Sequence, residues 1–385
     1  MQSLNLQRLV VYSTGSMLGN ASSTHGYIRY LCGWDRRNLP SVFILTPERE
    51  PILLVPMRSA QLFAKETLCF DDIRVVSQTK TGQEITSIVS SLISKDQKIG
   101  YIGRNETPAP IYETLQKGAE GKEWIEANEI IDEQRIVKDE IQIVFHQRAA
   151  DICDAMFETL TREIRKGKKA YPLQADLEYT AKYEGCEHAS TFLSIGPVVD
   201  RPRYAKGECY RVPQKGDQIL AALFVMYEGH WGHAVRIGTI GEPNKAQIRA
   251  FDIVLEMEEA ALNCMKPGIE LNEVWMASDN VLRNFYPNVR DLGWYWLKTG
   301  HSLGLDYNDP ILSDVFPNPY LRTEDIERQE QNKSSVKIQK GMLFELHPNL
   351  FIPNKAAGVI GDMVLVNETG HEIMNKFPRQ LIVWQ

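Results

Sequence analysis

The sequence has few cysteines, and they form no motif. Its six cysteines lie far apart, without a CxxC pair or a regular spacing. This pattern indicates buried thiols in a reducing compartment and excludes a disulfide framework. No apolar run approaches the roughly 18 residues that a membrane span requires. The first thirty residues also hold too short an apolar run for a signal peptide. We therefore expect a cytoplasmic protein that does not associate with a membrane.

Positive charge is not gathered in any segment. The chain has 43 Lys and Arg against 50 Asp and Glu, for a net charge of −7 and a pI near 5.7. Proteins that bind nucleic acid present a basic stripe or patch to the phosphate backbone, so we expect no nucleic acid partner. The length of 385 residues and a hydrophobic content of 43% predict two or three domains with a substantial core.

Nucleotide-binding motifs and the common hydrolase motifs are also absent. The chain has no GxGxxG, GxxxxGK[ST], HExxH or GxSxG. Histidines in the second half carry the remaining chemical signal. His233 follows a predicted turn, His301 lies in a glycine-containing segment, and His347 lies in a predicted strand, where the alternation of side chains puts Glu345 on the same face. The sequence alone does not bring these segments together.

Two patterns divide the chain at about residue 135. Residues 1–135 alternate short apolar runs with turn signals and include a helical stretch at 85–94, which is typical of a small α/β domain. From Asp139 a long amphipathic helix begins, so we expect a second domain over 136–385 and an α/β (α+β) fold overall. The second domain is predicted to have helices at 173–184, 244–265 and 271–285, and strands at 190–195, 218–227, 234–240, 343–352, 363–366 and 372–374.

Several segments resemble the superfamily of creatinase, aminopeptidase P, prolidase and methionine aminopeptidase. They are GYIRYLCGWDRRNLPSVFIL (26–45), RIVKDEIQIVFHQRAADICDAMFETL (135–160), KPG (266–268), TGHSLGLDYNDP (299–310), QKGMLFELHPNLFIP (339–353) and AGVIGDMVLVNETG (357–370). The resemblance covers nearly the whole chain. It implies a creatinase-like N-terminal domain over 1–135, a pita-bread catalytic domain over 136–385, and a homodimer.

The metal ligands of this superfamily are altered in the sequence. Its metallopeptidases bind two metal ions with five ligands in the order Asp, Asp, His, Glu, Glu. The resemblance places these positions at Ala222, His233, His301, His347 and Gly361. The first metal loses its ligands, whereas three histidines replace the set around the second. The resemblance therefore implies one divalent metal ion bound by His233, His301 and His347, with zinc as the leading candidate and iron or manganese as alternatives.

Further residues have expected roles around this metal. Glu345 is the candidate general base and Glu228 a second choice, while Asn308 stands at the superfamily's second active-site histidine. The candidates for substrate binding are arginine and aromatic side chains. Most of them are expected at or near the site, and Arg36 and Arg37 would reach it from the partner subunit. The candidates are Arg201, Arg203, Tyr204, Trp231, Arg36 and Arg37.

The function that fits these expectations is hydrolysis of a small carboxylated C–N compound, such as an amide or amidine. Three alternatives stay open at this point. One is a metal-independent amidinohydrolase like creatinase, although the catalytic histidine of creatinase would fall near Ala205. The second is a non-haem iron oxidoreductase or lyase, which a three-histidine site also suits. The third is a non-catalytic binding module.

Overall fold

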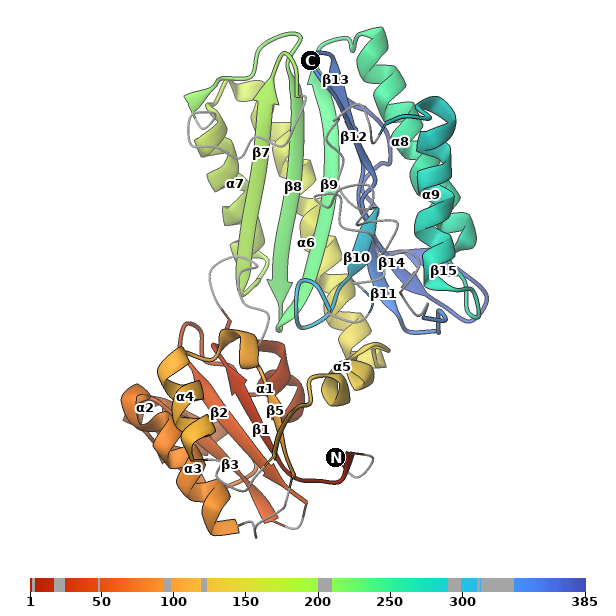
Figure 1. The fold of residues 1–385 in the computed structure, drawn as a ribbon. Helices are drawn as coiled ribbons and strands as arrows, with labels where there is room; N and C mark the ends of the chain where they lie inside the picture. The colour runs from red at the N-terminus through yellow and green to blue at the C-terminus, as the bar shows by residue number, and fades with distance from the viewer. Residues whose placement is uncertain are drawn as a thin grey trace. The chain divides into compact units, whose positions relative to one another are not determined.

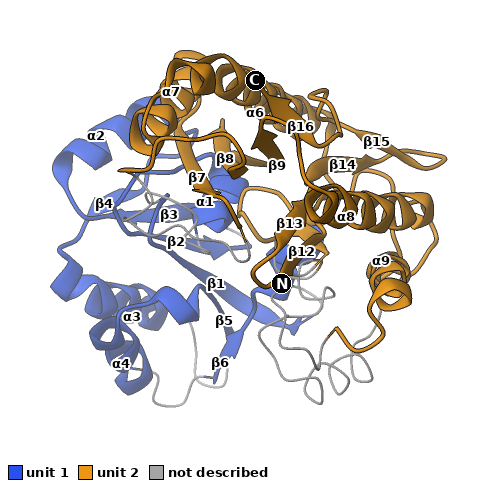
Figure 2. Ribbon diagram, turned by 90° about the horizontal axis from the view of Figure 1, so that it is seen from above, with its two compact units in different colours: residues 1–134 blue, residues 135–385 orange. Residues whose placement is uncertain are grey.

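A computed structural model of the protein describes residues 1, 4–16, 25–47, 49–92, 98–118, 123–199, 210–289, 299–309, 312 and 336–385. The chain forms two compact units, Met1–Gln134 and Arg135–Gln385 (Figure 2). The sequence pattern had placed the change of domain one residue later, between 135 and 136. Among the described residues, no helix combines the length and the apolar composition that crossing a bilayer requires.

The first unit is built on a six-stranded mixed sheet. Its strand order is β4-β3-β2-β1-β5-β6. The strands are β1 (Leu6–Ser13), β2 (Ser41–Thr46), β3 (Arg49–Val55), β4 (Ile73–Val75), β5 (Lys98–Ile102) and β6 (Glu123–Glu126). Strand β1 pairs antiparallel with β2 and parallel with β5. It lies in the interior of the sheet and is almost wholly buried, which explains its continuous apolar run.

Helices cover both faces of this sheet. They are α1 (His25–Cys32), α2 (Arg58–Thr67), α3 (Thr81–Leu92), α4 (Ala109–Lys117) and α5 (Glu129–Arg135). Leu9 and Val11 point into the core that includes α1 and α2, whereas Val10 and Tyr12 point into the core that includes α3 and α4. Because successive side chains of a strand point to opposite faces, β1 contributes residues to the apolar cores on both sides of the sheet. The described residues also include short 3₁₀ segments, among them η2 (Gln78–Lys80) and η3 (Arg104–Glu106) here and η4 (Ile164–Lys166) in the second unit.

The second unit contains a four-stranded sheet of order β16-β9-β8-β7. Its strands are β7 (His188–Gly196), β8 (Gln218–Tyr227), β9 (His230–Ile240) and β16 (Ile382–Trp384). Strands β8 and β9 form a hairpin whose two turn residues, Glu228 and Gly229, both have positive φ. This conformation matches the twist of a tight hairpin. Helices α6 (Glu140–Glu163) and α7 (Ala170–Tyr183) pack against one face of the sheet (Figure 1).

The other half of this unit carries a second four-stranded sheet, β10-β11-β14-β15, and the hairpin β12-β13. These strands are β10 (Gly300–Ser302), β11 (Leu343–Leu346), β12 (Asn349–Ile352), β13 (Ala356–Val359), β14 (Asp362–Val366) and β15 (His371–Ile373). Helices α8 (Lys245–Cys264) and α9 (Leu271–Phe285) lie beside them (Figure 1). An antiparallel bridge between Val235 and Gly361 joins β9 to the start of β14. The two sheets therefore meet at this bridge.

Two long helices of the second unit begin at side chains that cap them. Asp139 and Gln142 form a capping box at the start of α6, and Asn244 and Gln247 form another at the start of α8. The apolar period of the long helix from Asp139 includes Ile141 and Val144. Both are exposed, at 66% and 64%. The apolar period correctly indicated a helix, but burial in its first turns depends on what the fold packs there.

The predicted single strand over 343–352 is two strands. It is interrupted at His347-Pro348, between β11 and β12. Proline has no N–H to give to a ladder, which accounts for the break. The backbone N–H of His347 donates to Thr299 O at 2.7 Å, and Asn349 Nδ2 donates to His347 O at 2.8 Å. These bonds fix the backbone of His347 just beyond the end of β11.

Candidate metal centre

Three imidazoles and one carboxylate converge where the two sheets of the second unit meet. His233 comes from β9, His301 from β10 and Glu345 from β11, while His347 follows β11. His301 and Glu345 are direct partners across the antiparallel ladder, so their side chains lie on the same face. The Val235–Gly361 bridge brings His233 alongside them. The fold thus assembles residues that are spread over more than a hundred positions of the chain.

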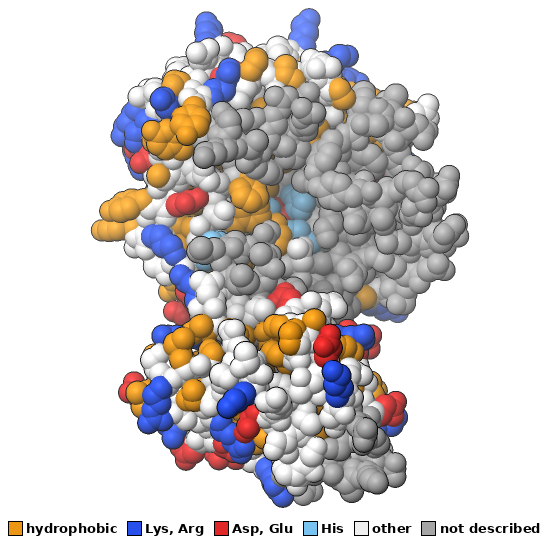
Figure 3. Space-filling view, turned by 60° about the vertical axis from the view of Figure 1, so that its left-hand side comes forward, with side chains coloured by type: hydrophobic (Ala, Val, Ile, Leu, Met, Phe, Trp, Pro, Cys, Tyr) orange, Lys and Arg blue, Asp and Glu red, His pale blue; other side chains and the backbone are white. Residues whose placement is uncertain are grey.

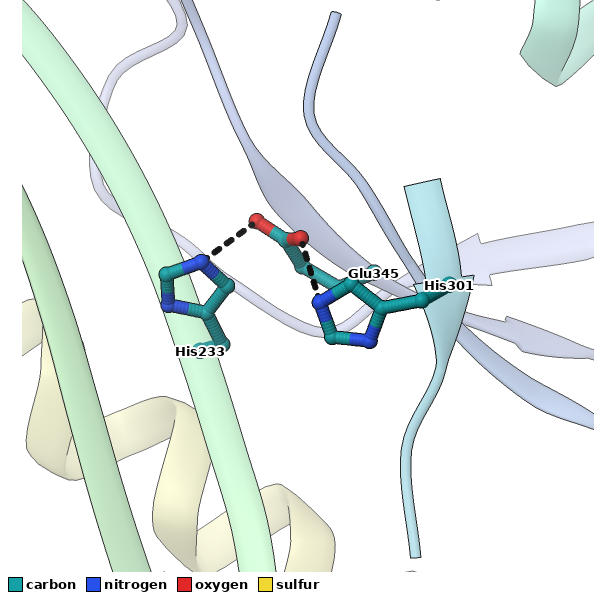
Figure 4. A group of neighbouring side chains, drawn as sticks. All are labelled: His233, His301 and Glu345. Atoms are coloured by element: carbon teal, nitrogen blue, oxygen red, sulfur yellow. Dashed lines mark ion pairs between the residues drawn. The ribbon is translucent and has the colours of Figure 1, made fainter. Parts of the chain in front are cut away.

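The carboxylate of Glu345 lies among the three imidazole rings. Glu345 Oε1 is 3.6 Å from His233 Nε2, and Glu345 Oε2 is 3.5 Å from His301 Nε2 and 3.2 Å from His347 Nε2. Figure 4 shows the carboxylate of Glu345 between the rings of His233 and His301. One ligand atom from each of His233, His301 and Glu345 lies within 4.8 Å of the other two. His347 adjoins this group through its contact with Glu345.

His233 is oriented by its neighbouring strand. Its Nδ1 lies 2.7 Å from the carbonyl oxygen of Leu223. Because a carbonyl only accepts, Nδ1 carries the proton and Nε2 keeps its lone pair, directed at Glu345. The ring of Phe224 stacks on that of His233, with centroids 4.2 Å apart. Burial lowers the pKa of His233 to about 4, although the hydrogen bond to Leu223 O opposes this shift. The ring is therefore neutral at pH 7, with the lone pair of Nε2 available to a metal.

Glu345 is the chemically unusual member of the cluster. Its side chain is fully buried, and neither carboxylate oxygen has a hydrogen-bond partner among the described residues. Burial raises the pKa of Glu345 well above its ordinary value, and the nearby carboxylates of Asp362 and Glu258 raise it further. An ionised carboxylate that is buried without hydrogen bonds lowers the free energy of unfolding unless a nearby cation compensates its charge.

Gly361 leaves the space that Glu345 occupies. A Cβ at this position would lie 2.5 Å from Glu345 Oε1, 2.9 Å from His347 Cβ and 3.1 Å from Val235 Cβ. These distances are shorter than van der Waals contact, so a side chain at 361 and the observed position of Glu345 exclude one another. The carboxylate of Glu345 therefore lies in the space next to Gly361, the position predicted to lack the superfamily's last glutamate.

His233, His301 and Glu345 form a donor group of a size that one divalent metal ion could bind, and His347 adjoins it. Ligand atoms bound at about 2.0–2.2 Å to one tetrahedral or octahedral ion lie roughly 3.0–3.5 Å from each other. The separations between Glu345 and the three imidazole nitrogens are 3.2–3.6 Å. Neutral imidazoles and a carboxylate are also the ligands that zinc, iron and manganese accept. In contrast, Ala222 and Gly361 have no side-chain donor atom for a second ion.

The other predicted site residues have different positions. Trp231 is buried, and its indole N–H has no hydrogen-bond partner among the described residues. Its ring contacts Tyr307, with centroids 5.9 Å apart. Glu228 lies in the exposed turn between β8 and β9, where its carbonyl oxygen is 2.7 Å from His230 Nδ1. Asn308 is exposed on the loop after β10.

The remaining candidates lie outside the described part of the second unit. Arg201, Arg203 and Tyr204 lie outside the described residues. Arg36 and Arg37 belong to the first unit, where the Arg36 guanidinium lies 5.8 Å from the ring centroid of Phe63. Their predicted contact with a substrate of a partner subunit stays a prediction.

Two residues that were not predicted from the sequence lie at the site. Phe224 covers one face of His233, and the hydroxyl of Tyr307 lies 3.1 Å from His301 Nε2. The alternation of β8 and β9 would have predicted Phe224, because it pairs directly with His233. Tyr307 adjoins Asn308, and only the path of the loop decides which of the two side chains turns inward.

The four side chains of the cluster are buried to different degrees. Figure 3 shows histidine side chains next to hydrophobic side chains on one face of the molecule. Of the four side chains, that of His347 is the most exposed, at 10%, whereas that of Glu345 is fully buried. The interior of the site is thus fully buried, and His347 is the least buried of its four members.

This mixed α/β architecture with a buried imidazole–carboxylate cluster belongs to the class of metal-dependent hydrolases. Residues 145–368, more than half of the chain, match the model of metallopeptidase family M24, and residues 6–137 match the creatinase/prolidase N-terminal domain. The chain therefore belongs to metallopeptidase family M24. This confirms the predicted superfamily and the predicted metal-dependent hydrolase of C–N bonds, whose cofactor is a divalent metal ion.

Curated relatives and solved structures agree with the family. The chain is 26% identical over 277 residues to an Xaa-Pro dipeptidase of Pyrococcus horikoshii, covering 71% of this chain and 72% of the relative. It is 23% identical to the putative dipeptidase YkvY of Bacillus subtilis, covering 70% of this chain and 69% of that protein.

The structural matches extend over both units. The prolidase of Pyrococcus horikoshii superposes with a TM-score of 0.79 at 21% identity, covering 99% of this chain and 97% of that one. An X-Pro aminopeptidase of Thermotoga maritima gives 0.75 at 21% identity, with 99% of each chain covered. These matches confirm the predicted fold, a creatinase-like domain followed by a pita-bread domain.

Proposed function

We propose that the protein is a mononuclear metal hydrolase that cleaves a C–N bond in a small carboxylated compound, such as an amide or amidine. The metal would be held by His233, His301, His347 and Glu345, and zinc is the leading candidate. One observation carries this proposal: a fully buried carboxylate without hydrogen-bond partners among the described residues faces three imidazole nitrogens at 3.2–3.6 Å.

Glu345 changes its proposed role from general base to ligand. Its contacts are with the nitrogens proposed to bind the metal, and its side chain is fully buried. As a ligand it supplies the negative charge that three neutral imidazoles lack. Its position in the space above Gly361 supports a relocated carboxylate ligand.

The surrounding residues prepare this site for the metal. Leu223 O fixes the tautomer of His233, so that Nε2 is ready to bind. Phe224 excludes water from one face of that ring. A bound divalent ion would polarise the scissile group of the substrate and lower the pKa of water towards neutrality. Because Ala222 and Gly361 contribute no ligand, we propose that the site works with one ion, unlike a two-metal peptidase.

Metal content of purified variants tests this proposal. We expect one equivalent of metal per chain in the unmodified protein by mass spectrometry. The content should fall at least tenfold in Glu345→Gln, which retains the size of the side chain but not its charge, and likewise in His233→Ala. His371→Ala is the matched control, because His371 Nδ1 lies near Met265 O at 3.2 Å and outside the cluster. Full metal content in Glu345→Gln would contradict the proposed ligand.

A second candidate function rests on the same donors. His233, His301 and Glu345 form a group of two histidines and one carboxylate, which is the ligand set of non-haem ferrous enzymes that use dioxygen. Anaerobic loading with Fe²⁺, followed by measurement of oxygen uptake, separates this candidate from the hydrolase. Release of an amine from amide or amidine substrates by zinc-loaded protein, without oxygen uptake, would favour hydrolysis.

We also propose a cytoplasmic homodimer, on the basis of the cysteine pattern and the resemblance stated above. In that dimer Arg36 and Arg37 would contact a substrate carboxylate in the partner's site, together with Arg201, Arg203 and Tyr204. Sedimentation of the purified protein and loss of substrate affinity in Arg37→Ala would test these two points.

A further inference from the structure

The hydroxyl of Tyr307 lies at the metal centre. It is 3.1 Å from Nε2 of His301, and the two rings are 4.6 Å apart. The Tyr307 ring also lies 5.4 Å from that of His233. Tyr307 therefore contacts two of the four proposed ligands, although it was not among the residues expected to form the site.

The proton arrangement of His301 makes Tyr307 the donor in this contact. His301 Nδ1 lies 3.0 Å from the carbonyl oxygen of Ser302, so the proton of a neutral ring is on Nδ1. Nε2 then has only a lone pair, and it accepts from the phenol. When that lone pair binds a metal, the phenol no longer donates to Nε2. An oxygen atom of a molecule bound beside the metal would then be an acceptor for it.

The Tyr307 ring is held in a fixed position. It packs against Phe224 and Trp231, with centroids 5.4 and 5.9 Å away. The loop on which it lies is fixed by hydrogen bonds from Trp231 N to Gly304 O at 2.9 Å and from Ser302 Oγ to Asp309 O at 2.7 Å. A donor that is fixed before substrate binds does not lose free energy by reorganising during the reaction.

Charged groups on both sides of Tyr307 strengthen this loop. Arg135 Nη2 donates to Asp306 Oδ2 and to Asp309 Oδ1, both at 2.7 Å, and Lys138 Nζ donates to Asp309 Oδ2 at 2.5 Å. All four side chains are buried. The loop 302–309 is thus anchored directly before and two residues after the tyrosine.

We infer that Tyr307 is a catalytic residue, whose hydroxyl donates a hydrogen bond to the substrate oxygen that becomes negatively charged during cleavage. This inference rests on the proposed metal site and deepens it. It assigns the substrate a carbonyl or similar oxygen that lies against Tyr307 when the metal is bound. The exposed Asn308, which stands at the superfamily's second active-site histidine, has no part in this role.

Tyr307→Phe tests the inference, because it removes the hydroxyl and keeps the ring. The protein is loaded with Co²⁺, whose visible spectrum reports its ligands, and is then titrated with acetohydroxamate as a chelating anion with a carbonyl oxygen. We expect Tyr307→Phe to bind Co²⁺ as tightly as the unmodified protein but acetohydroxamate roughly ten- to a hundredfold more weakly. Tyr227→Phe, which removes the hydroxyl of a half-buried tyrosine in the same unit, should change neither affinity.

The other outcomes overturn the inference in distinguishable ways. Equal affinity of Tyr307→Phe and the unmodified protein for acetohydroxamate would mean that the tyrosine only packs against the site. Loss of Co²⁺ affinity in Tyr307→Phe would mean that the tyrosine is a ligand and not a donor to the substrate. If the unmodified protein does not bind Co²⁺ at all, the proposed metal site fails, and the role of Tyr307 fails with it.

Discussion

Individual residues at the centre of the second unit balance stability against metal binding. Glu345 is buried without hydrogen-bond partners among the described residues, and its pKa is raised well above the ordinary value because burial disfavours the charged form. Such a group lowers the free energy of unfolding when no cation is present. It is retained at a place where Gly361 leaves room for it. The position of the Glu345 carboxylate therefore depends on the absence of a side chain at position 361.

At this scale, Gly361→Ala should disrupt the site. The added methyl group would lie 2.5 Å from Glu345 Oε1 and 2.9 Å from His347 Cβ, so both would have to move. We expect the free energy of unfolding to fall by about 1–3 kcal/mol and metal affinity to fall at least tenfold. Urea unfolding and metal titration measure the two effects.

Gly370→Ala is the matched control for this substitution. A Cβ at Gly370 would have no atom within 4 Å. The control should change the free energy of unfolding by less than about 0.5 kcal/mol. Equal behaviour of the two variants would show that the position of Glu345 is not constrained by Gly361.

At the scale of the element, the loop 302–309 depends on a buried cluster of charges. Arg135 and Lys138, just before α6, bind Asp306 and Asp309 on the loop. Burial alone would raise the pKa of Asp309, but the charges of Lys138 and Arg135 outweigh it and lower that pKa below its ordinary value. Burial lowers the pKa of Lys138, against the attraction of Asp309. The loop that carries Tyr307 is thus held by compensated charges.

Asp309→Asn should destabilise the protein in a pH-dependent way. Loss of one partner leaves Lys138 and Arg135 partly uncompensated, which costs about 3–5 kcal/mol at neutral pH. Because the folded pKa of Asp309 is lowered, its contribution is present above the unfolded value of about 3.9 and is lost as pH falls through the folded pKa. The difference between the variant and the unmodified protein should therefore shrink on acidification below about pH 4.

Urea unfolding of both proteins between pH 7 and pH 3 measures this difference. Glu368→Gln is a suitable control, since Glu368 pairs with Lys340 at 2.7 Å in an exposed position. A surface pair of this kind should contribute almost nothing to stability. A pH-independent difference for Asp309→Asn would contradict an ionised Asp309 in the folded state.

At the scale of the whole molecule, the proposed metal links two sheets of one compact unit. Its ligands come from β9, from β10 and from the end of β11, and the Val235–Gly361 bridge is the backbone link between the sheets. A metal that binds only the folded protein raises its stability by about 2.7 kcal/mol at a concentration of a hundred times Kd. This stabilisation belongs to the unit Arg135–Gln385, which contains all four proposed ligands.

Hydrogen exchange followed by mass spectrometry should show this distribution. On addition of Zn²⁺ to metal-free protein, we expect slower exchange in β9, β10, β11 and β14, and unchanged exchange in the unit Met1–Gln134. His233→Ala should abolish the difference. Slower exchange in both units to the same extent would contradict a metal site confined to the second unit.

Most elements of the fold could be predicted from local pattern. The apolar runs of β1, β8 and β9 and the caps of α6 and α8 are properties of short segments. The interruption at Pro348 and the exposure of Ile141 and Val144 were not predicted, because they depend on the partners that a segment finds in the folded chain. The three histidines were predicted only through resemblance to the superfamily, and nothing in their spacing indicates that they meet.

The sequence by itself determined the superfamily, the two-domain α/β fold and the residue types available for a metal, since these follow from composition, periodicity and recognisable segments. Only the tertiary structure decided that Glu345 lies among the imidazoles, that Tyr307 and not Asn308 turns towards His301, and that Gly361 makes room for the carboxylate. The physical reason is that a side chain's neighbours are fixed by strand register and loop path, which link positions far apart in the chain.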